Sequence, residues 1–77
     1  MRLLVKTTTG TTTVIEADPD ETVESLKTKV FQKQQIPVES QRLIIHGKQL
    51  ENGHKLKEYK LAENSVLDLI LHIKGGF

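Results

Sequence analysis

The sequence predicts an α+β roll, in which a mixed, curved sheet packs on a single helix. Three observations predict it: alternating apolar residues at both ends of the chain, one stretch of helical periodicity between them, and turn residues that separate shorter strands. The 77 residues, 36% of them hydrophobic, are enough for one core and too few for two. Since the chain has no cysteine, well-packed apolar side chains must stabilise this core.

Residues 1–17 are predicted to form a β-hairpin. Alternate positions of both strands face inward, and these are Met1, Leu3, Val5, Thr13, Ile15 and Ala17. Threonine suits strands, because β-branched side chains fit a pleated surface. Thr8, Thr9 and Gly10 make the turn, since glycine readily supplies the positive φ that such turns need.

A helix is predicted to follow the hairpin. Thr22 can cap its first amides, and Pro37 ends it. Val23, Leu26 and Val30 fall at i, i+3 and i+7, so they form one apolar stripe that must cover the sheet. The charges match the helix dipole, with acidic residues at its start and basic ones toward its end: Asp20, Glu21, Glu24, Lys29 and Lys33.

Three more strands complete the predicted sheet. In order, the segments are a strand over Gln41–Ile45, a turn at His46-Gly47, a strand over Lys48–Leu50, a turn at Asn52-Gly53 and a last strand from Val66 to about His72. An irregular or helical connection before the last strand holds Leu56, Tyr59 and Leu61. The inward residues of the last strand are Leu67, Leu69 and Leu71. The domain thus spans residues 1–72, and residues 73–77 are expected to form a flexible tail.

Composition and charge exclude several classes of function. A net charge of +1 with 4% aromatic residues does not suit nucleic-acid binding. The longest apolar runs are far shorter than the roughly 20 residues that span a bilayer, so we expect no membrane partner. No secretory stretch begins the sequence, so a monomer in the cytoplasm or nucleus is expected.

Catalytic chemistry is not expected either. The spacing of His46, His54 and His72 matches no zinc site, and cysteine ligands are absent. The acidic residues around the helix start lack the spacing of a calcium loop. We therefore expect a protein that is not an enzyme and that holds no metal and no cofactor.

Strand alternation leaves apolar side chains on the outside of two strands. Leu43, Ile44 and Ile45 are consecutive and cannot all face the core, so with Leu43 inside, Ile44 points outward. Ile70 points outward by the same rule, because alternate leucines of its strand fill the core. These isoleucines are either ordinary surface or the centre of a protein-docking site. The rim of such a site would be charged, through Arg42, Lys48 and His72.

Motifs at fixed spacing run along the whole chain. They are Val5-Lys6-Thr7, Thr9-Gly10, Thr22, Ile36-Pro37, Gln41-Arg42-Leu43-Ile44, Gly47-Lys48-Gln49-Leu50-Glu51, Gly53, Leu56, Tyr59, Ser65, the Leu67/Leu69/Leu71 series and Gly75-Gly76. Through them the chain resembles the ubiquitin family from Met1 to Gly76 without a gap. The resemblance implies the β-grasp roll, and it places Ile44 and Ile70 side by side on the open face of the sheet.

In ubiquitin this open face is the surface that most receptor domains bind. Carried over, the protein-binding patch consists of Ile44, Ile70, Arg42, Gly47, Lys48, Thr8, Asp68 and His72. Among these positions, ubiquitin has a leucine in place of Thr8 and a histidine in place of Asp68. The loss of apolar area and the added negative charge should favour other partners than those of ubiquitin itself.

The tail carries the second implied site. In the family, the carboxylate of the second glycine is adenylated with ATP, passed to enzyme cysteines and joined to a lysine of a target. Gly75 and Gly76 would then be the conjugation site, and Phe77 would be removed first. The partners are activating, conjugating and deconjugating enzymes, although ubiquitin has an arginine in place of His72. Alternatively, the diglycine begins a linker, and the chain is a ubiquitin-like interaction domain of a larger protein that is not conjugated and docks ubiquitin receptors or the proteasome.

Five lysines match positions at which ubiquitin builds chains, and these possible acceptors are Lys48, Lys6, Lys29, Lys33 and Lys27. Thr11 and Glu63 replace two further acceptor lysines. Lys27 is expected to be largely buried, with its stem packed beside the helix stripe.

Two positions without glycine are expected to adopt positive φ. Ubiquitin ends its helix with a glycine where this chain has Gln35, so the left-handed cap should be strained here by about 1 kcal/mol. Asn64 tolerates positive φ and suits the turn before the last strand.

Overall fold

The computed structural model describes residues 1–72, and its order of elements confirms the predicted one. The elements are β1 (Arg2–Thr7), β2 (Thr12–Glu16), α1 (Val23–Gln34), the 3-10 helix η1 (Val38–Ser40), β3 (Gln41–Ile45), β4 (Lys48–Gln49), the 3-10 helix η2 (Leu56–Tyr59) and β5 (Ser65–Leu71). The predicted strand β3 is confirmed residue for residue, while β4 and β5 end one residue earlier than expected.

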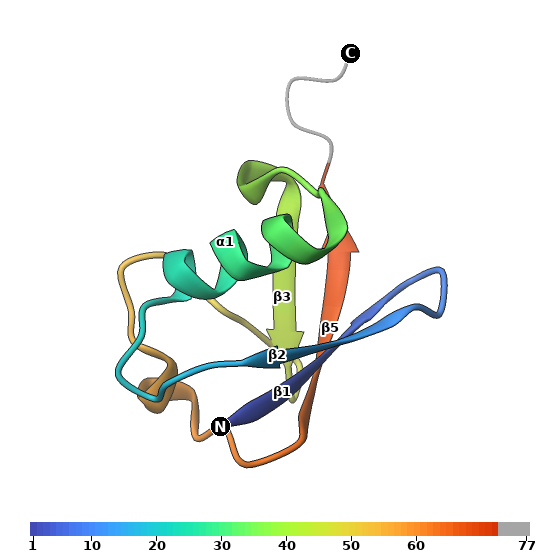
Figure 1. The fold of residues 1–77 in the computed structure, drawn as a ribbon. Coiled ribbons are helices and arrows are strands. Elements are labelled where there is room, and N and C mark those ends of the chain that lie inside the picture. The colour runs from blue at the N-terminus through green and yellow to red at the C-terminus, as the bar shows by residue number, and fades with distance from the viewer. Residues whose placement is uncertain (73–77) are drawn as a thin grey trace.

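All five strands belong to one mixed sheet in the order β2-β1-β5-β3-β4. β1 pairs in parallel with β5, and every other pairing is antiparallel. Figure 1 shows α1 lying over one face of this sheet. The sequence therefore predicted the α+β roll correctly.

The core fills the space between α1 and the sheet. The predicted helix stripe is confirmed, since Val23, Leu26 and Val30 are completely buried. They belong to a cluster whose other buried members are Leu3, Val5, Ile15, Ala17, Leu43, Ile45, Leu50, Leu56, Leu67 and Leu69. Strands β1, β2, β3 and β5 therefore contribute residues of one face to the core and turn the other face toward solvent, whereas both residues of β4 are exposed.

The prediction for one core residue was wrong. Leu71 was expected inside, but its side chain is 56% exposed. The pairing of β5 with β1 ends at Leu69, so β1 no longer lies beside β5 at Leu71. Its cross-strand partner is Gln41, a polar residue that the structure buries instead. The amide Nε2 of Gln41 donates to the carbonyl oxygens of Lys27 and Ile36, at 2.9 and 3.0 Å.

Helix α1 begins and ends as the sequence predicts. The hydroxyl of Thr22 accepts the N–H of Ser25 at 3.2 Å. At the other end, Gln35 adopts the left-handed conformation, with φ 63°, and donates its N–H to the carbonyl of Phe31. The helix is 12 residues long, and no helix within residues 1–72 is long and apolar enough to cross a membrane.

Positive φ values define three of the turns. His46 and Gly47 both adopt positive φ, as a tight turn between two antiparallel strands requires. Asn64 has φ 66°, as predicted. Lys60, with φ 54°, ends η2 in the same conformation and was not anticipated from the sequence.

We expect Gln35→Gly to raise the free energy of unfolding by about 1 kcal/mol, because glycine adopts the left-handed conformation without the clash of a Cβ atom. Urea denaturation at neutral pH measures the change. Gln35→Ala is the matched control, since it removes the side-chain contact with Gln32 but keeps the Cβ atom. Equal stability of the glycine and alanine variants would contradict the strain.

Candidate functional site

The outer face of the sheet is the face turned away from α1. Cross-strand register there pairs Ile44 with Asp68, and Arg42 with Ile70. Ile44 and Ile70 are therefore diagonal neighbours across β3 and β5, rather than directly side by side as expected. Ile70 is 40% exposed and Ile44 is half-buried, whereas Leu43 and Ile45 are buried.

A shallow groove adjoins Ile70 where β1 enters its turn. It measures about 290 Å³ and is lined by Lys6, Thr7, Thr8, Asp68, Leu69 and Ile70. The structure thus brings Thr8, Asp68 and Ile70 together, from segments that are far apart in the sequence. Asp68 is the acidic residue among those that line this groove.

The other predicted patch residues lie around this centre. Arg42 is exposed beside Ile70, and Gly47 forms the β3–β4 turn. His72 is exposed beyond the end of β5 and donates its N–H to the carbonyl of Ser40 at 2.7 Å. Lys48 instead lines a different pocket, which the sequence did not predict.

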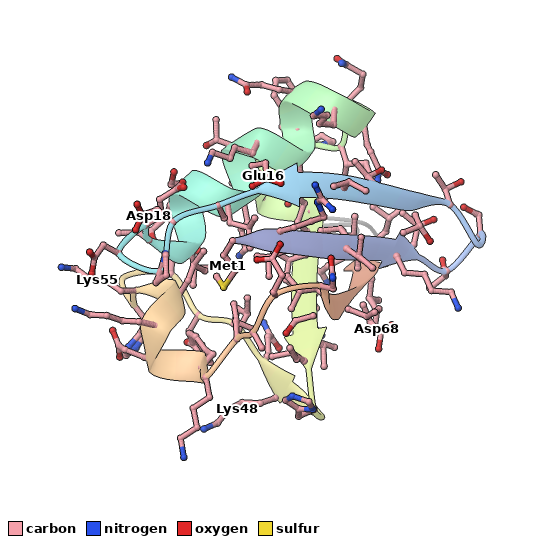
Figure 2. All side chains as sticks on the ribbon, turned by 60° about the horizontal axis from the view of Figure 1, so that its bottom comes forward. Met1, Glu16, Asp18, Lys48, Lys55 and Asp68 are labelled. Atoms are coloured by element: carbon pink, nitrogen blue, oxygen red, sulfur yellow. The ribbon has the colours of Figure 1, made fainter. Side chains whose placement is uncertain are left out.

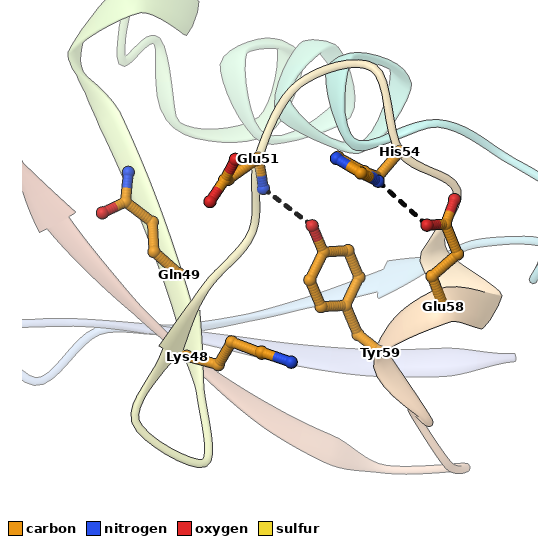
Figure 3. A pocket seen from close by; sticks show the side chains of 6 residues that line it. All are labelled: Lys48, Gln49, Glu51, His54, Glu58 and Tyr59. Atoms are coloured by element: carbon orange, nitrogen blue, oxygen red, sulfur yellow. Dashed lines mark hydrogen bonds and ion pairs between the residues drawn. The ribbon is translucent and has the colours of Figure 1, made fainter.

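That pocket measures about 230 Å³ and is lined by Lys48, Gln49, Glu51, His54, Glu58 and Tyr59 (Figure 3). The hydroxyl of Tyr59 accepts the N–H of Glu51 at 3.0 Å. His54 Nδ1 lies 2.9 Å from Glu58 Oε1, and its ring meets Tyr59 edge to face, with 6.3 Å between centroids. The spacing of four between His54 and Glu58 was the signal that sequence reasoning missed.

Hydrogen bonds shift the pKa values of His54 and Glu58. The contact with Glu58 raises the pKa of His54 above its ordinary value. The N–H of Lys55, and then His54, lower the pKa of Glu58. The pair can therefore carry a full ionic interaction at mildly acidic pH. No group of three His, Cys, Asp or Glu side chains within residues 1–72 could hold a metal ion.

The five candidate acceptor lysines differ in access. Lys6, Lys33 and Lys48 are exposed. Lys27 is buried, as predicted, and its Nζ donates to Asn52 Oδ1 at 3.1 Å. Burial lowers the pKa of Lys27, and the hydrogen bond to Asn52 holds its amine in place.

Lys29 is half-buried, and its amine already makes two hydrogen bonds. Its Nζ lies 2.6 Å from Glu21 Oε1 and 2.9 Å from the carbonyl oxygen of Glu16. Partial burial would raise the pKa of Glu21, but the hydrogen bonds from Lys29 and Ser25 outweigh it and hold that pKa low. Lys29 is thus built into the junction of β2 with α1. The expected conjugation site, Gly75, Gly76 and Phe77, lies outside the described residues.

Comparison with known proteins gives consistent matches. The profile described as the Ubiquitin family matches residues 3–74. The chain is 40% identical over 76 residues to Ubiquitin-like protein NEDD8 of Dictyostelium discoideum, a match that covers 99% of both. It is equally identical over 76 residues to Ubiquitin-like protein 1 of Schizosaccharomyces pombe, covering 99% of this chain and 97% of that protein. With Ubiquitin-like protein 4A of Callithrix jacchus it shares 38% over 71 residues, which are 92% of this chain but 45% of the relative.

We expect the stability of the domain to depend on pH through His54. Its pKa is raised in the folded state, so its pairing with Glu58 contributes stability fully below the unfolded value near 6.5. This contribution is lost as the pH rises through the raised folded pKa. Glu58→Gln should therefore destabilise the domain more at pH 5.5 than at pH 8.5, as urea denaturation would measure.

His54→Gln serves as the matched control, because it should remove the same pH dependence. NMR titration of the imidazole gives an independent reading, in which Glu58→Gln lowers the pKa of His54. An imidazole that titrates at or below 6.5 in the wild type would contradict this electrostatic assignment.

Proposed function

Because the chain belongs to the ubiquitin family, we propose that it is a ubiquitin-like protein modifier that is conjugated through Gly76 after removal of Phe77. The observation that carries the proposal is the diglycine pair after the β-grasp domain, at the position through which the family is conjugated. The match to ubiquitin-like relatives over 76 residues supports it. In this proposal the protein acts in the cytoplasm or nucleus.

Separate enzymes would supply the chemistry. A processing enzyme hydrolyses the bond between Gly76 and Phe77, which leaves a carboxylate on Gly76. An activating enzyme joins this carboxylate to AMP from ATP with release of pyrophosphate, and its cysteine thiol then displaces AMP to form a thioester. After transfer to a conjugating enzyme, a target amine displaces the thiol and forms an isopeptide bond, which deconjugating enzymes hydrolyse.

Receptor domains would read the modifier through the outer face of the sheet. We propose Ile44 and Ile70 as the centre of this docking surface, since both lie outside the core and occupy diagonal positions on neighbouring strands. Arg42 extends the surface and supplies positive charge beside Ile70. Among the acceptor lysines, Lys6, Lys33 and Lys48 are the accessible candidates for further modification.

A second candidate is an interaction domain that is never conjugated. The match that covers 45% of Ubiquitin-like protein 4A favours it, because there the same domain occupies under half of a longer chain. The diglycine would then begin a linker, and the domain would dock ubiquitin receptors or the proteasome through the same surface. Whether the chain is conjugated to other proteins distinguishes the two candidate functions.

We expect the form that ends at Gly76 to produce an ATP-dependent, thiol-sensitive adduct in extracts of its own organism. Non-reducing electrophoresis with intact-mass analysis detects the adduct. Gly76→Ala is the matched control. Its altered terminus should sharply reduce the yield of the adduct. If no adduct forms with any activating enzyme of that organism, the modifier proposal fails and the interaction domain is favoured.

We expect Ile44→Ala to weaken binding to purified ubiquitin-receptor domains at least about tenfold, because a central apolar contact is lost. Isothermal titration or NMR titration measures the affinity. Glu39→Ala, an exposed change in η1, should leave it unchanged. Receptors that bind the Ile44 variant as tightly as the wild type would exclude this surface under both candidate functions.

A further inference from the structure

The turn at Asn52 and Gly53 is held against the start of helix α1. Lys55, two residues beyond this turn, forms an isolated β-bridge with Thr22, the residue that caps the helix. Figure 2 shows Lys55 close to the start of α1. The turn therefore has a fixed position relative to the helix, and side chains of α1 reach its peptide groups.

Two side chains of α1 bind this turn. Nζ of Lys27 donates to Oδ1 of Asn52 at 3.1 Å. Oε1 of Glu24 accepts the backbone N–H of Gly53 at 2.9 Å. Positions three apart are neighbours on the surface of a helix. The side-chain carbonyl of Asn52 and the N–H of Gly53 are therefore both directed toward the same part of α1.

An asparagine that precedes a glycine has a reaction of its own. The backbone nitrogen of the glycine attacks Cγ of the asparagine side chain, which releases ammonia and closes a succinimide ring. Glycine allows the attack most readily because it has no Cβ atom beside the nitrogen. Asn52 and Gly53 are both exposed, so water reaches the ring once it has formed. The attack needs a group that stabilises negative charge on Oδ1 and a group that accepts the proton from the nitrogen.

Lys27 and Glu24 meet these two needs. The amine of Lys27 contacts the oxygen on which negative charge develops during the attack. The carboxylate of Glu24 contacts the proton that the nitrogen of Gly53 must lose. The N–H of Gly53 is also the main cause that lowers the pKa of Glu24, so this carboxylate is ionised at neutral pH. Both groups stand at the reacting atoms before the reaction starts.

We propose that Asn52 is a self-modification site, at which the nitrogen of Gly53 displaces ammonia while Lys27 stabilises the attacked oxygen and Glu24 accepts the proton. The bond from Gly53 N to Asn52 Cγ forms, the bond from Cγ to the side-chain nitrogen breaks, and the proton passes through Glu24 to the departing ammonia. Water then opens the ring at either carbonyl, which gives aspartate or isoaspartate. The modification consumes one water molecule and releases one ammonia molecule.

The modification changes the charge of the loop. It adds a negative charge to a chain whose formal net charge is +1. In the aspartate product, a carboxylate replaces the amide that contacts Lys27, so the hydrogen bond becomes an ion pair. In the isoaspartate product, the backbone gains a methylene group, which displaces Gly53 from Glu24. The site depends neither on conjugation nor on the outer face of the sheet.

Incubation of the full chain at neutral pH and physiological temperature tests the proposal. Peptide mapping by mass spectrometry follows the conversion of Asn52 to aspartate and isoaspartate, with Asn64 of the same molecule as the internal reference. We expect Asn52 to convert at least about threefold faster in the folded protein than in guanidinium chloride, because only folding brings α1 to the turn. Conversion that is as fast or faster in guanidinium chloride would overturn the proposal, as would an Asn52 that persists as long as Asn64.

Single variants test the two assigned groups. We expect Lys27→Met and Glu24→Gln each to slow the conversion in the folded protein at least about fivefold and to leave the rate in guanidinium chloride unchanged. Lys33→Met and Glu39→Gln make the same exchanges at exposed positions and should change neither rate. Circular dichroism verifies that each variant is folded. Glu24 is exposed, so Glu24→Gln is decisive by itself if Lys27→Met does not fold. Conversion of Glu24→Gln at the wild-type rate would overturn the proposal.

The variant Asn52→Asp reproduces the aspartate product. We expect its midpoint of urea denaturation to lie above that of the wild type, because a carboxylate pairs with Lys27. The gain should vanish when Asn52→Asp is combined with Lys27→Met. A midpoint at or below that of the wild type would overturn the ion pair as a consequence of the modification.

Discussion

The parallel pairing of β1 with β5 is the constraint on which the rest of the structure depends. It joins the first and the last strand of the domain, so every other element must lie within the connection between them. The register sets Val5 beside Leu67 and Leu4 beside Val66. Because neighbouring side chains point to opposite faces, the same pairing buries one set under α1 and exposes the other. The core and the outer surface are thus two consequences of one register.

The composition of the outer surface then depends on the residues that strand alternation turns outward. β5 contributes Val66, Asp68 and Ile70 to it, and none of these positions is needed by the core. Under the proposed function, substitutions there alter the choice of partner without a loss of core packing. In this chain the outward set combines apolar side chains with a single acid at their centre.

Much of the fold was predictable, because its signals are local. The strand over Gln41–Ile45 and the helix stripe follow from periodicity, and the cap at Thr22 follows from residue type. Leu71 was misplaced because alternation alone does not reveal where the partner strand ends.

The candidate site was predictable only in part. Alternation placed Ile44 outside the core, but it could not give the cross-strand register that sets Asp68 opposite it. The pocket around His54 and Glu58 depends on a loop and a 3-10 helix whose geometry leaves no periodic pattern.

The most direct measurement of the proposed modifier function is an immunoblot, with intact-mass analysis, of the native protein in lysate of its source cells. We predict a free species that ends at Gly76 together with a ladder of larger adducts; one discrete larger band, whose sequence continues through Phe77, would contradict it.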